Sequence, residues 1–299
     1  MKFKRLLSLI LVFILVTALC PFAAVRAEEA EETEAPSLLE GIDFSEIDSI
    51  VTKHSKRASY AIAVVDLKTG EIVGSKNMKS KMSASNMIAL PLLFTADQRI
   101  AAGDIDLGRS VKFQYIQSGG RGEFYKASKG KYYTLERLLC AMLRSSDGNA
   151  SNSVLDFLTR KSVNSCCKDN GMPGVSIAHY IGDTKDNGKK DNFVSAKALC
   201  DILYAQYNAE SDLGRDFLAE NLTVNEKTNN IGLGRHLEDK ADTLMDFYNV
   251  TTRKYNNISI VESGDRAYAV AWLSNSERHA VLEETAGDVG VYLFEKICG

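Results

Sequence analysis

The residues most able to do chemistry lie in the stretch A84-S85-N86-M87-I88-A89-L90-P91, where Ser85 precedes an apolar helical segment. At a helix start, backbone N–H groups and the helix dipole favour negative charge on a hydroxyl. A serine hydroxyl is nevertheless a weak nucleophile that needs a base within hydrogen-bond reach. Ile88, one helical turn later, can neither accept a proton nor carry a positive charge. Ser85 is therefore a candidate nucleophile without a base on its own helix, or else a cap of the helix that begins at Asn86.

A second polar run, S146-D147-G148-N149, follows an amphipathic segment whose apolar residues recur at helical spacing from Leu135 to Leu143. Ser146 is a candidate for a second catalytic hydroxyl. Asp147 and Asn149 are candidates for substrate binding. The competing interpretation is that Ser146 and Asp147 only cap a helix in a turn.

A third candidate region covers residues 246–256, D-F-Y-N-V-T-T-R-K-Y-N. Thr251, Thr252, Arg253 and Lys254 could offer hydroxyls and cations to a substrate, and the first three are the candidates for substrate binding. The Lys-Thr-Gly at residues 68–70 instead fits a hairpin turn, because Thr-Gly supplies turn geometry. The four histidines are far apart and have no partner at metal-ligand spacing, so we expect no metal and no cofactor.

Strands are predicted near both ends of the chain and helices in the middle. Residues 59–66 and 72–75 form a predicted hairpin, and residues 257–261 and 267–273 form a second strand pair followed by a helix over about 280–297. The pattern between them is mostly helical. We predict an α+β fold in which one antiparallel sheet is built from both termini and flanked by helices. A mainly helical lobe, about residues 95–245, is inserted between them.

The first residues have the pattern of a secretory signal peptide, because basic residues precede an apolar run that ends in small residues. A membrane anchor is the weaker alternative, since the apolar run is short. We predict a signal peptide over residues 1–27, an acidic disordered linker over 28–45 and one domain over 46–299. Loss of residues 1–27 removes four positive charges, so the net charge falls from −3 to −7. An acidic protein of this kind is not expected to bind nucleic acid or an anionic membrane.

Five cysteines remain after the predicted cleavage: Cys140, Cys166, Cys167, Cys200 and Cys298. The odd number means that at least one is free or pairs between chains.

The order of these elements and motifs resembles the class A β-lactamase and penicillin-binding transpeptidase family over roughly residues 46–299. The resemblance implies that Ser85 stands for the nucleophile of a Ser-x-x-Lys motif and Ser146 for the serine of Ser-Asp-Asn. The chain departs from the family at the chemically essential positions. Ile88 replaces the lysine, Gly148 replaces the asparagine, and residues 246–256 contain no Lys-Thr-Gly. The interval from Gly171 to Ser195 contains no glutamate to aim a deacylating water.

Two functions follow from this partial match. The first is an exported, extracytoplasmic pseudoenzyme that binds a cell-wall fragment or a protein partner. The second is a weak or altered serine hydrolase that uses Ser85 on a β-lactam or a peptidoglycan peptide. Loss of a nucleophile's base typically costs orders of magnitude in rate, which favours the first. A secreted structural module without a ligand is a third interpretation.

Overall fold

A computed structural model describes residues 42–113, 122–124, 126, 129–183, 191–222, 232–234 and 242–298. The predicted signal peptide, and the predicted linker up to residue 41, lie outside the described residues. Within the described part, no helix is both long enough and apolar enough to span a bilayer.

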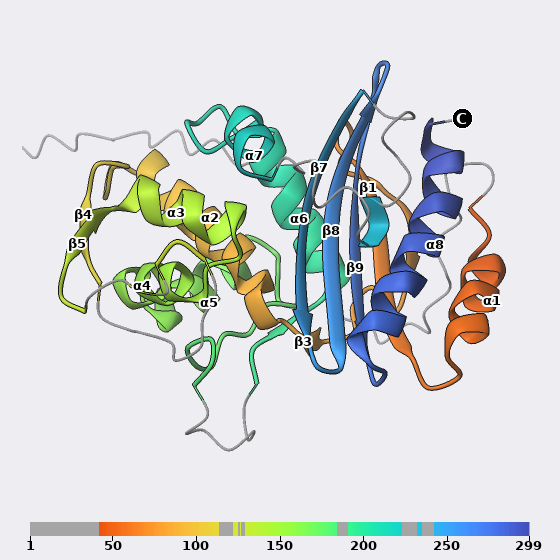
Figure 1. Cartoon of the computed structure of the whole chain (residues 1–299). Coiled ribbons are helices and arrows are strands. Elements are labelled where there is room, and N and C mark those ends of the chain that lie inside the picture. The colour runs from red at the N-terminus through yellow and green to blue at the C-terminus, as the bar shows by residue number, and fades with distance from the viewer. Residues whose placement is uncertain are drawn as a thin grey trace, which may run out of the picture. The chain divides into compact units, whose positions relative to one another are not determined.

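One five-stranded antiparallel sheet contains strands from both ends of the chain, in the order β2-β1-β9-β8-β7. Its strands are β1 (Ser59–Asp66), β2 (Ile72–Lys76), β7 (Thr243–Thr251), β8 (Lys254–Ser263) and β9 (Arg266–Asn275). Strand β1 pairs with β9 over its whole length, with Ile62 opposite Trp272. The long connection between β2 and β7 holds the inserted helices (Figure 1). The predicted α+β fold is therefore confirmed.

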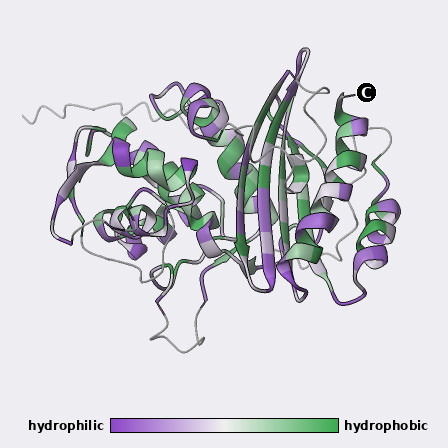
Figure 2. Ribbon diagram, viewed as in Figure 1, coloured by the Kyte–Doolittle hydropathy of each residue, from purple (hydrophilic) through white to green (hydrophobic). Residues whose placement is uncertain are grey.

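Both faces of this sheet are covered by helices. The side chains of Ile62 and Val64 join a core with α1 (Phe44–His54) and α8 (His279–Cys298). Those of Ala61 and Ala63 face the opposite core, which includes α6 (Ala196–Tyr207). Because β1 and β9 are buried on both faces, their sequences are apolar over most of their length rather than alternating. Strand β8 also carries the buried polar residues Asn256, Asn257 and Ser259. In Figure 2 the strands of the sheet accordingly show green segments interrupted by purple ones.

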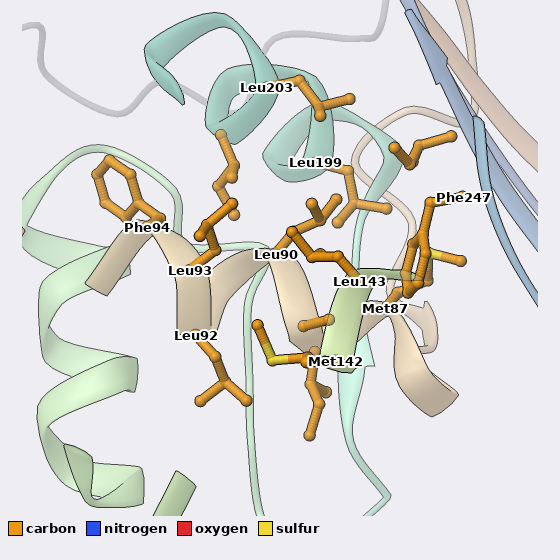
Figure 3. Close-up of a cluster of buried hydrophobic side chains, with 14 of the residues drawn as sticks. Met87, Leu90, Leu92, Leu93, Phe94, Met142, Leu143, Leu199, Leu203 and Phe247 are labelled. Atoms are coloured by element: carbon orange, nitrogen blue, oxygen red, sulfur yellow. The ribbon is translucent and has the colours of Figure 1, made fainter. Parts of the chain in front are cut away.

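The inserted lobe is built around a helix that is buried on nearly every side. Its helices are α2 (Ala89–Ala101), α3 (Leu135–Arg144), α4 (Gly148–Leu158), α5 (Arg160–Asp169) and α7 (Arg215–Leu222). All residues of α2 from Ala89 to Asp97 are buried. Leu90 and Leu93 of α2 contact the apolar core to which α3 contributes Met142 and α6 contributes Leu199 (Figure 3). The serine turn therefore leads directly into a dry, apolar interior.

Short elements connect the lobe to the sheet. Strand β3 (Met82–Ser83) pairs with β6 (Phe193–Val194), and β4 (Ser110–Lys112) pairs with β5 (Tyr132–Thr134). A 3-10 turn, η1 (Ser85–Ile88), joins β3 to α2, and a second, η2 (Gly232–Gly234), contacts α8.

Three expectations about elements need comment. The Lys-Thr-Gly at residues 68–70 is indeed a turn, in which Asp66 accepts hydrogen bonds from the amides of Lys68 and Thr69. Helix α1 begins at Phe44, so residues 42–45 belong to the domain rather than to the predicted linker. The inserted helices begin at Ala89, somewhat before the predicted lobe, and β7 was not predicted as a strand.

Candidate functional site

Ser85 opens the η1 turn in a strained backbone conformation. Its φ of 48° lies in the left-handed region that residues with a side chain seldom adopt. The Ser85 hydroxyl caps neither this turn nor α2, and no described residue forms a hydrogen bond with it. The interpretation of Ser85 as a helix cap is therefore wrong. Ser146 has the same unusual backbone, with a φ of 49°. Strain of this kind often accompanies functional sites, so both serines remain candidates on geometry.

The side chain that reaches the second motif belongs to Asn86, not to Ser85. Asn86 Nδ2 donates a hydrogen bond to the Ser146 carbonyl oxygen at 2.6 Å. This contact joins the serine turn to the start of α4 across 60 residues of sequence. An amide therefore lies where the two predicted catalytic segments meet, and an amide is not a nucleophile of the kind that serine hydrolases use.

The position of the expected base is apolar and dry. Ile88 has no exposed surface, and neither has Ala89 beside it. If the motif is read from Ser85, its fourth residue is Ile88; if it is read from Asn86, its fourth residue is Ala89. In both registers the amine of a Ser-x-x-Lys pair is missing from the helix.

Asp147 is a structural cap. It is the N-cap of α4, and its carboxylate accepts hydrogen bonds from the amides of Asn149, Ala150 and Phe124 at 2.9, 2.9 and 2.6 Å. The side chain is fully buried. Burial raises the pKa of Asp147 above its ordinary value, although the three backbone donors work in the opposite direction. Because these bonds occupy the carboxylate, its predicted role in substrate binding gains no support from the geometry.

Asn149 is likewise buried, and its Nδ2 donates to the Phe124 carbonyl at 3.3 Å. The helix-capping interpretation of the second motif is thus confirmed for Asp147. Asn149 fastens the loop at Phe124 to the start of α4.

The second serine contacts the edge of the sheet. Ser146 Oγ donates to the Tyr248 carbonyl oxygen at 3.2 Å, which links the start of α4 to strand β7. Strand β7 is an edge strand, and η1 also contacts it. The serine turn, the α4 cap and β7 therefore meet at one place, although they come from three distant parts of the chain.

The predicted residues of the third region lie at the C-terminal end of β7, where Thr251 pairs with Lys254 of β8. Thr251, Thr252 and Arg253 are exposed at the tip of the β7–β8 turn. Arg253 Nη2 donates to the Ser276 carbonyl at 2.7 Å, and the Thr252 carbonyl accepts from the amide of His279 at 3.2 Å. The described contacts of Thr252 and Arg253 are thus directed toward the β9–α8 connection and not toward Ser146.

Two residues of β8 hold the serine segment: Lys254, which the sequence offered only as a possible cation for a substrate, and Asn256, which the sequence reasoning missed. Asn256 Nδ2 donates to the Ser83 carbonyl at 2.9 Å and lies 3.4 Å from that of Ala84. Lys254 Nζ is 2.5 Å from Ser83 Oγ and 3.2 Å from Asp191 Oδ2. No local spacing signals these contacts, because Lys254 and Asn256 lie more than 170 positions from Ser83 and Lys254 lies 63 positions from Asp191.

A polar cluster, which we call the Ser83 cluster, surrounds that lysine. It consists of Ser83, Lys254, Asp191 and His179. Ser83 Oγ donates to Asp191 Oδ2 at 2.5 Å, and His179 Nε2 is 3.4 Å from the other carboxylate oxygen. Partial burial acts to raise the pKa of Asp191, but the bond from Ser83 and the charge of Lys254 hold it below its ordinary value. The carboxylate is therefore ionised at neutral pH.

Among the described residues, no three His, Cys, Asp or Glu side chains are grouped so that they could hold a metal ion. Cys140, Cys166, Cys167 and Cys200 are free thiols.

Comparison with known proteins places this geometry in a family. The model of the "Beta-lactamase enzyme family" matches residues 44–296. A search of curated proteins found no match. Among solved structures, a β-lactamase from Sphaerobacter thermophilus DSM 20745 superposes with a TM-score of 0.73 at 17% identity, covering 85% of this chain and 97% of that one.

Two further structures have the same fold. PBP-A superposes with a TM-score of 0.72 at 16% identity over 88% of this chain and 98% of its own. An ancestral class A β-lactamase (GNCA) superposes with a TM-score of 0.71 at 15% identity, covering 84% of this chain and 98% of its own. The family match covers most of the sequence, and the antiparallel sheet with its inserted helices agrees with it. The chain belongs to the β-lactamase enzyme family.

Proposed function

We propose that this protein is an exported β-lactamase-like pseudoenzyme that binds a cell-wall peptide beside β7 without efficient turnover. The observation that carries the proposal is the complete burial of Ile88 and Ala89 in the apolar interior. A lysine base cannot arise at either position without placing a charge in that interior, which is costly for an unpaired amine. The nucleophile of the predicted motif therefore has no base on its own helix.

The proposed ligand is an extended peptide, because β7 is an edge strand beside the serine turn. Edge strands offer backbone donors and acceptors to an added strand, a common mode of peptide recognition. Asn86 and Ser146, which meet at the same place, supply polar groups for the peptide's amides. Wall peptides fit the predicted export of the chain.

A weak serine hydrolase is the second candidate function, and the strained backbone of Ser85 and Ser146 favours it. The similar fold of PBP-A has been solved, in a mutant, as an acyl-enzyme complex with penicillin G. A residual activity of this kind would use Ser85 and would be slow, because removing the activating base typically costs several orders of magnitude.

One experiment separates the two candidates. The protein without residues 1–27 is incubated with a fluorescent penicillin and with a chromogenic cephalosporin, and Ser85→Ala serves as the matched variant. We expect no Ser85-dependent label and no turnover. Binding of a soluble peptidoglycan stem peptide, measured by calorimetry, should persist in Ser85→Ala and weaken in Asn86→Ala. Ser85-dependent turnover would refute the proposal of a pseudoenzyme. If the unmodified protein did not bind the stem peptide, the proposed ligand would be wrong.

A further inference from the structure

Ser83, two residues before the predicted nucleophile, has the electrostatic partners that Ser85 lacks. Its Oγ is 2.5 Å from Lys254 Nζ and donates at 2.5 Å to Asp191 Oδ2. Since the lysine ammonium can only donate, the hydroxyl oxygen must accept from it while its own hydrogen is directed at the carboxylate. The oxygen is thus polarised from both sides, by a positive charge beside its lone pair and by an acceptor for its proton.

The Ser83 backbone is fixed by bonds from two other elements. Asn256 of β8 donates to the Ser83 carbonyl at 2.9 Å, and the amide of the next residue, Ala84, donates to the Asn192 carbonyl at 2.7 Å. Ser83 also pairs with Phe193 across the β3–β6 ladder. A nucleophile held by a rigid supporting shell loses little entropy on reaction.

The cluster is open to a reagent. The side chains of Lys254 and Asp191 are 35% and 36% exposed, and Ser83 is only partly buried. Water-accessible charges are screened, so the electrostatic help to Ser83 is weaker than in an enclosed enzyme site.

We propose that Ser83, with Lys254 and Asp191, is a nucleophilic site that accepts an acyl group from activated esters and strained amides. Ser83 Oγ attacks the acyl carbon, forming the ester bond, and the bond from that carbon to the leaving oxygen or nitrogen breaks. The Ser83 proton passes to Asp191 and from there to the leaving group. The Lys254 ammonium stabilises the negative charge that develops on the acyl oxygen.

The reaction at Ser83 is stoichiometric rather than catalytic. Asp191 is a weak base because its pKa lies below the ordinary value, where partial burial is outweighed by the Ser83 bond and the Lys254 charge. A weak base is enough to assist acylation of Ser83 when the leaving group is good. It is not enough to activate the water that would hydrolyse the resulting Ser83 ester. The acyl group therefore remains on Ser83.

The test uses p-nitrophenyl acetate as the probe, with the burst of nitrophenolate followed by absorbance and the acetylated residue located by peptide mass spectrometry. We expect one acetyl group per chain, on Ser83. Ser83→Ala should abolish the burst. Ser80→Ala, an exposed serine of the same segment, should retain it. Asp191→Asn keeps an acceptor oxygen but removes the charge, and should slow the burst about a hundredfold.

Thermal unfolding of each variant shows whether the fold is intact. A folded Ser83→Ala protein that still gives the burst overturns the proposal, and so does acetylation that maps to Ser85 or to lysines alone. The inference does not depend on peptide binding at β7, because stem-peptide affinity is measured separately and Ser83→Ala should leave it unchanged.

Discussion

At the residue scale, the centre of the site is defined by side chains that cannot exchange protons. Ile88 and Ala89 fill the interior behind the serine turn, and Asn86 presents an amide to Ser146. Strained backbone persists at Ser85 and Ser146, although no amine lies one helical turn after Ser85. The turn that carries Ser85 is anchored by the complete burial of Ile88 and Ala89.

Restoring a lysine by Ile88→Lys should fail to produce a hydrolase. The amine would enter an apolar core, so we expect the free energy of unfolding to fall by about 3 kcal/mol or more. The volume-conserving Ile88→Met should cost less than about 1.5 kcal/mol. Urea unfolding and cephalosporin turnover measure the two effects. A stable, fast Ile88→Lys hydrolase would contradict our account of Gly148 and the third region.

Asp246 makes stability depend on pH. Burial raises the pKa of Asp246 to about 6, with Ser259 and Asn257 donating to its carboxylate in partial compensation. A raised folded-state pKa contributes stability that is complete below the unfolded value near 4 and is lost as pH rises through about 6. The cost of ionising the partly buried carboxylate at neutral pH is at most roughly 3 kcal/mol.

Asp246→Asn should therefore remove the loss of stability that occurs as pH rises through about 6. The amide oxygen can accept both hydrogen bonds, and the variant should be more stable than the natural protein at pH 7.5 and similar to it at pH 4.5. Asp265→Asn, in the exposed turn before β9, is the matched control and should follow the natural pH dependence. Equal pH profiles for Asp246→Asn and the natural protein would show that the carboxylate is not buried as described.

At the scale of elements, the start of α4 fastens several segments together. The Asp147 carboxylate binds the first turn of α4 and the amide of Phe124, and Ser146 contacts β7. The loop carrying Phe124 is held so closely that a side chain at Gly122 would collide with Asp147. One buried carboxylate thus aligns a helix and a loop beside the serine turn.

Asp147→Ala should destabilise the protein by about 2–4 kcal/mol, because a helix cap is lost and three buried amides lose their acceptor. Asp147→Asn can still accept from Asn149 and Ala150 but places a donor against the Phe124 amide, so an intermediate loss is expected. Chemical denaturation measures both variants. An unchanged midpoint for Asp147→Ala would argue that α4 does not need this cap.

At the scale of the whole molecule, the four described thiols belong to one large core but differ in their access to solvent. Cys167 and Cys200 have no exposed surface, whereas Cys140 and Cys166 are half-buried. Burial raises the pKa of Cys167 to about 12 and raises that of Cys200 as well. Thiolate is the reactive form, so these two cysteines should be inert in the folded protein.

Ellman's reagent should therefore modify Cys140 and Cys166 in the native protein, and Cys167 and Cys200 only after unfolding in urea. The protein for this measurement lacks residues 1–27 and carries Cys298→Ser, so that four thiols remain. Native reaction of all four at equal rates would contradict the described packing.

The sequence by itself determined the elements with strong local periodicity, namely β1, β2, β9, the helices α3 and α6, and the closing helix α8. Strand β7 escaped prediction because Asp246 and Asn249 interrupt its apolar pattern, and hydrogen bonds from Ser259 and Asn257 of β8 accommodate the partly buried Asp246 there. The absence of two family motif residues could also be recognised from the sequence, because Ile88 and Gly148 stand at single positions within short motifs.

Only the tertiary structure decided which polar groups meet. Asn86 reaches Ser146 across 60 residues, and Lys254 reaches Ser83 across 171. Such contacts depend on how the inserted helices pack against a sheet built from both ends of the chain, and no periodicity along the sequence encodes them. For that reason the sequence could reveal that the serine helix lacks an amine, but only the folded chain placed a lysine beside Ser83 and not beside Ser85.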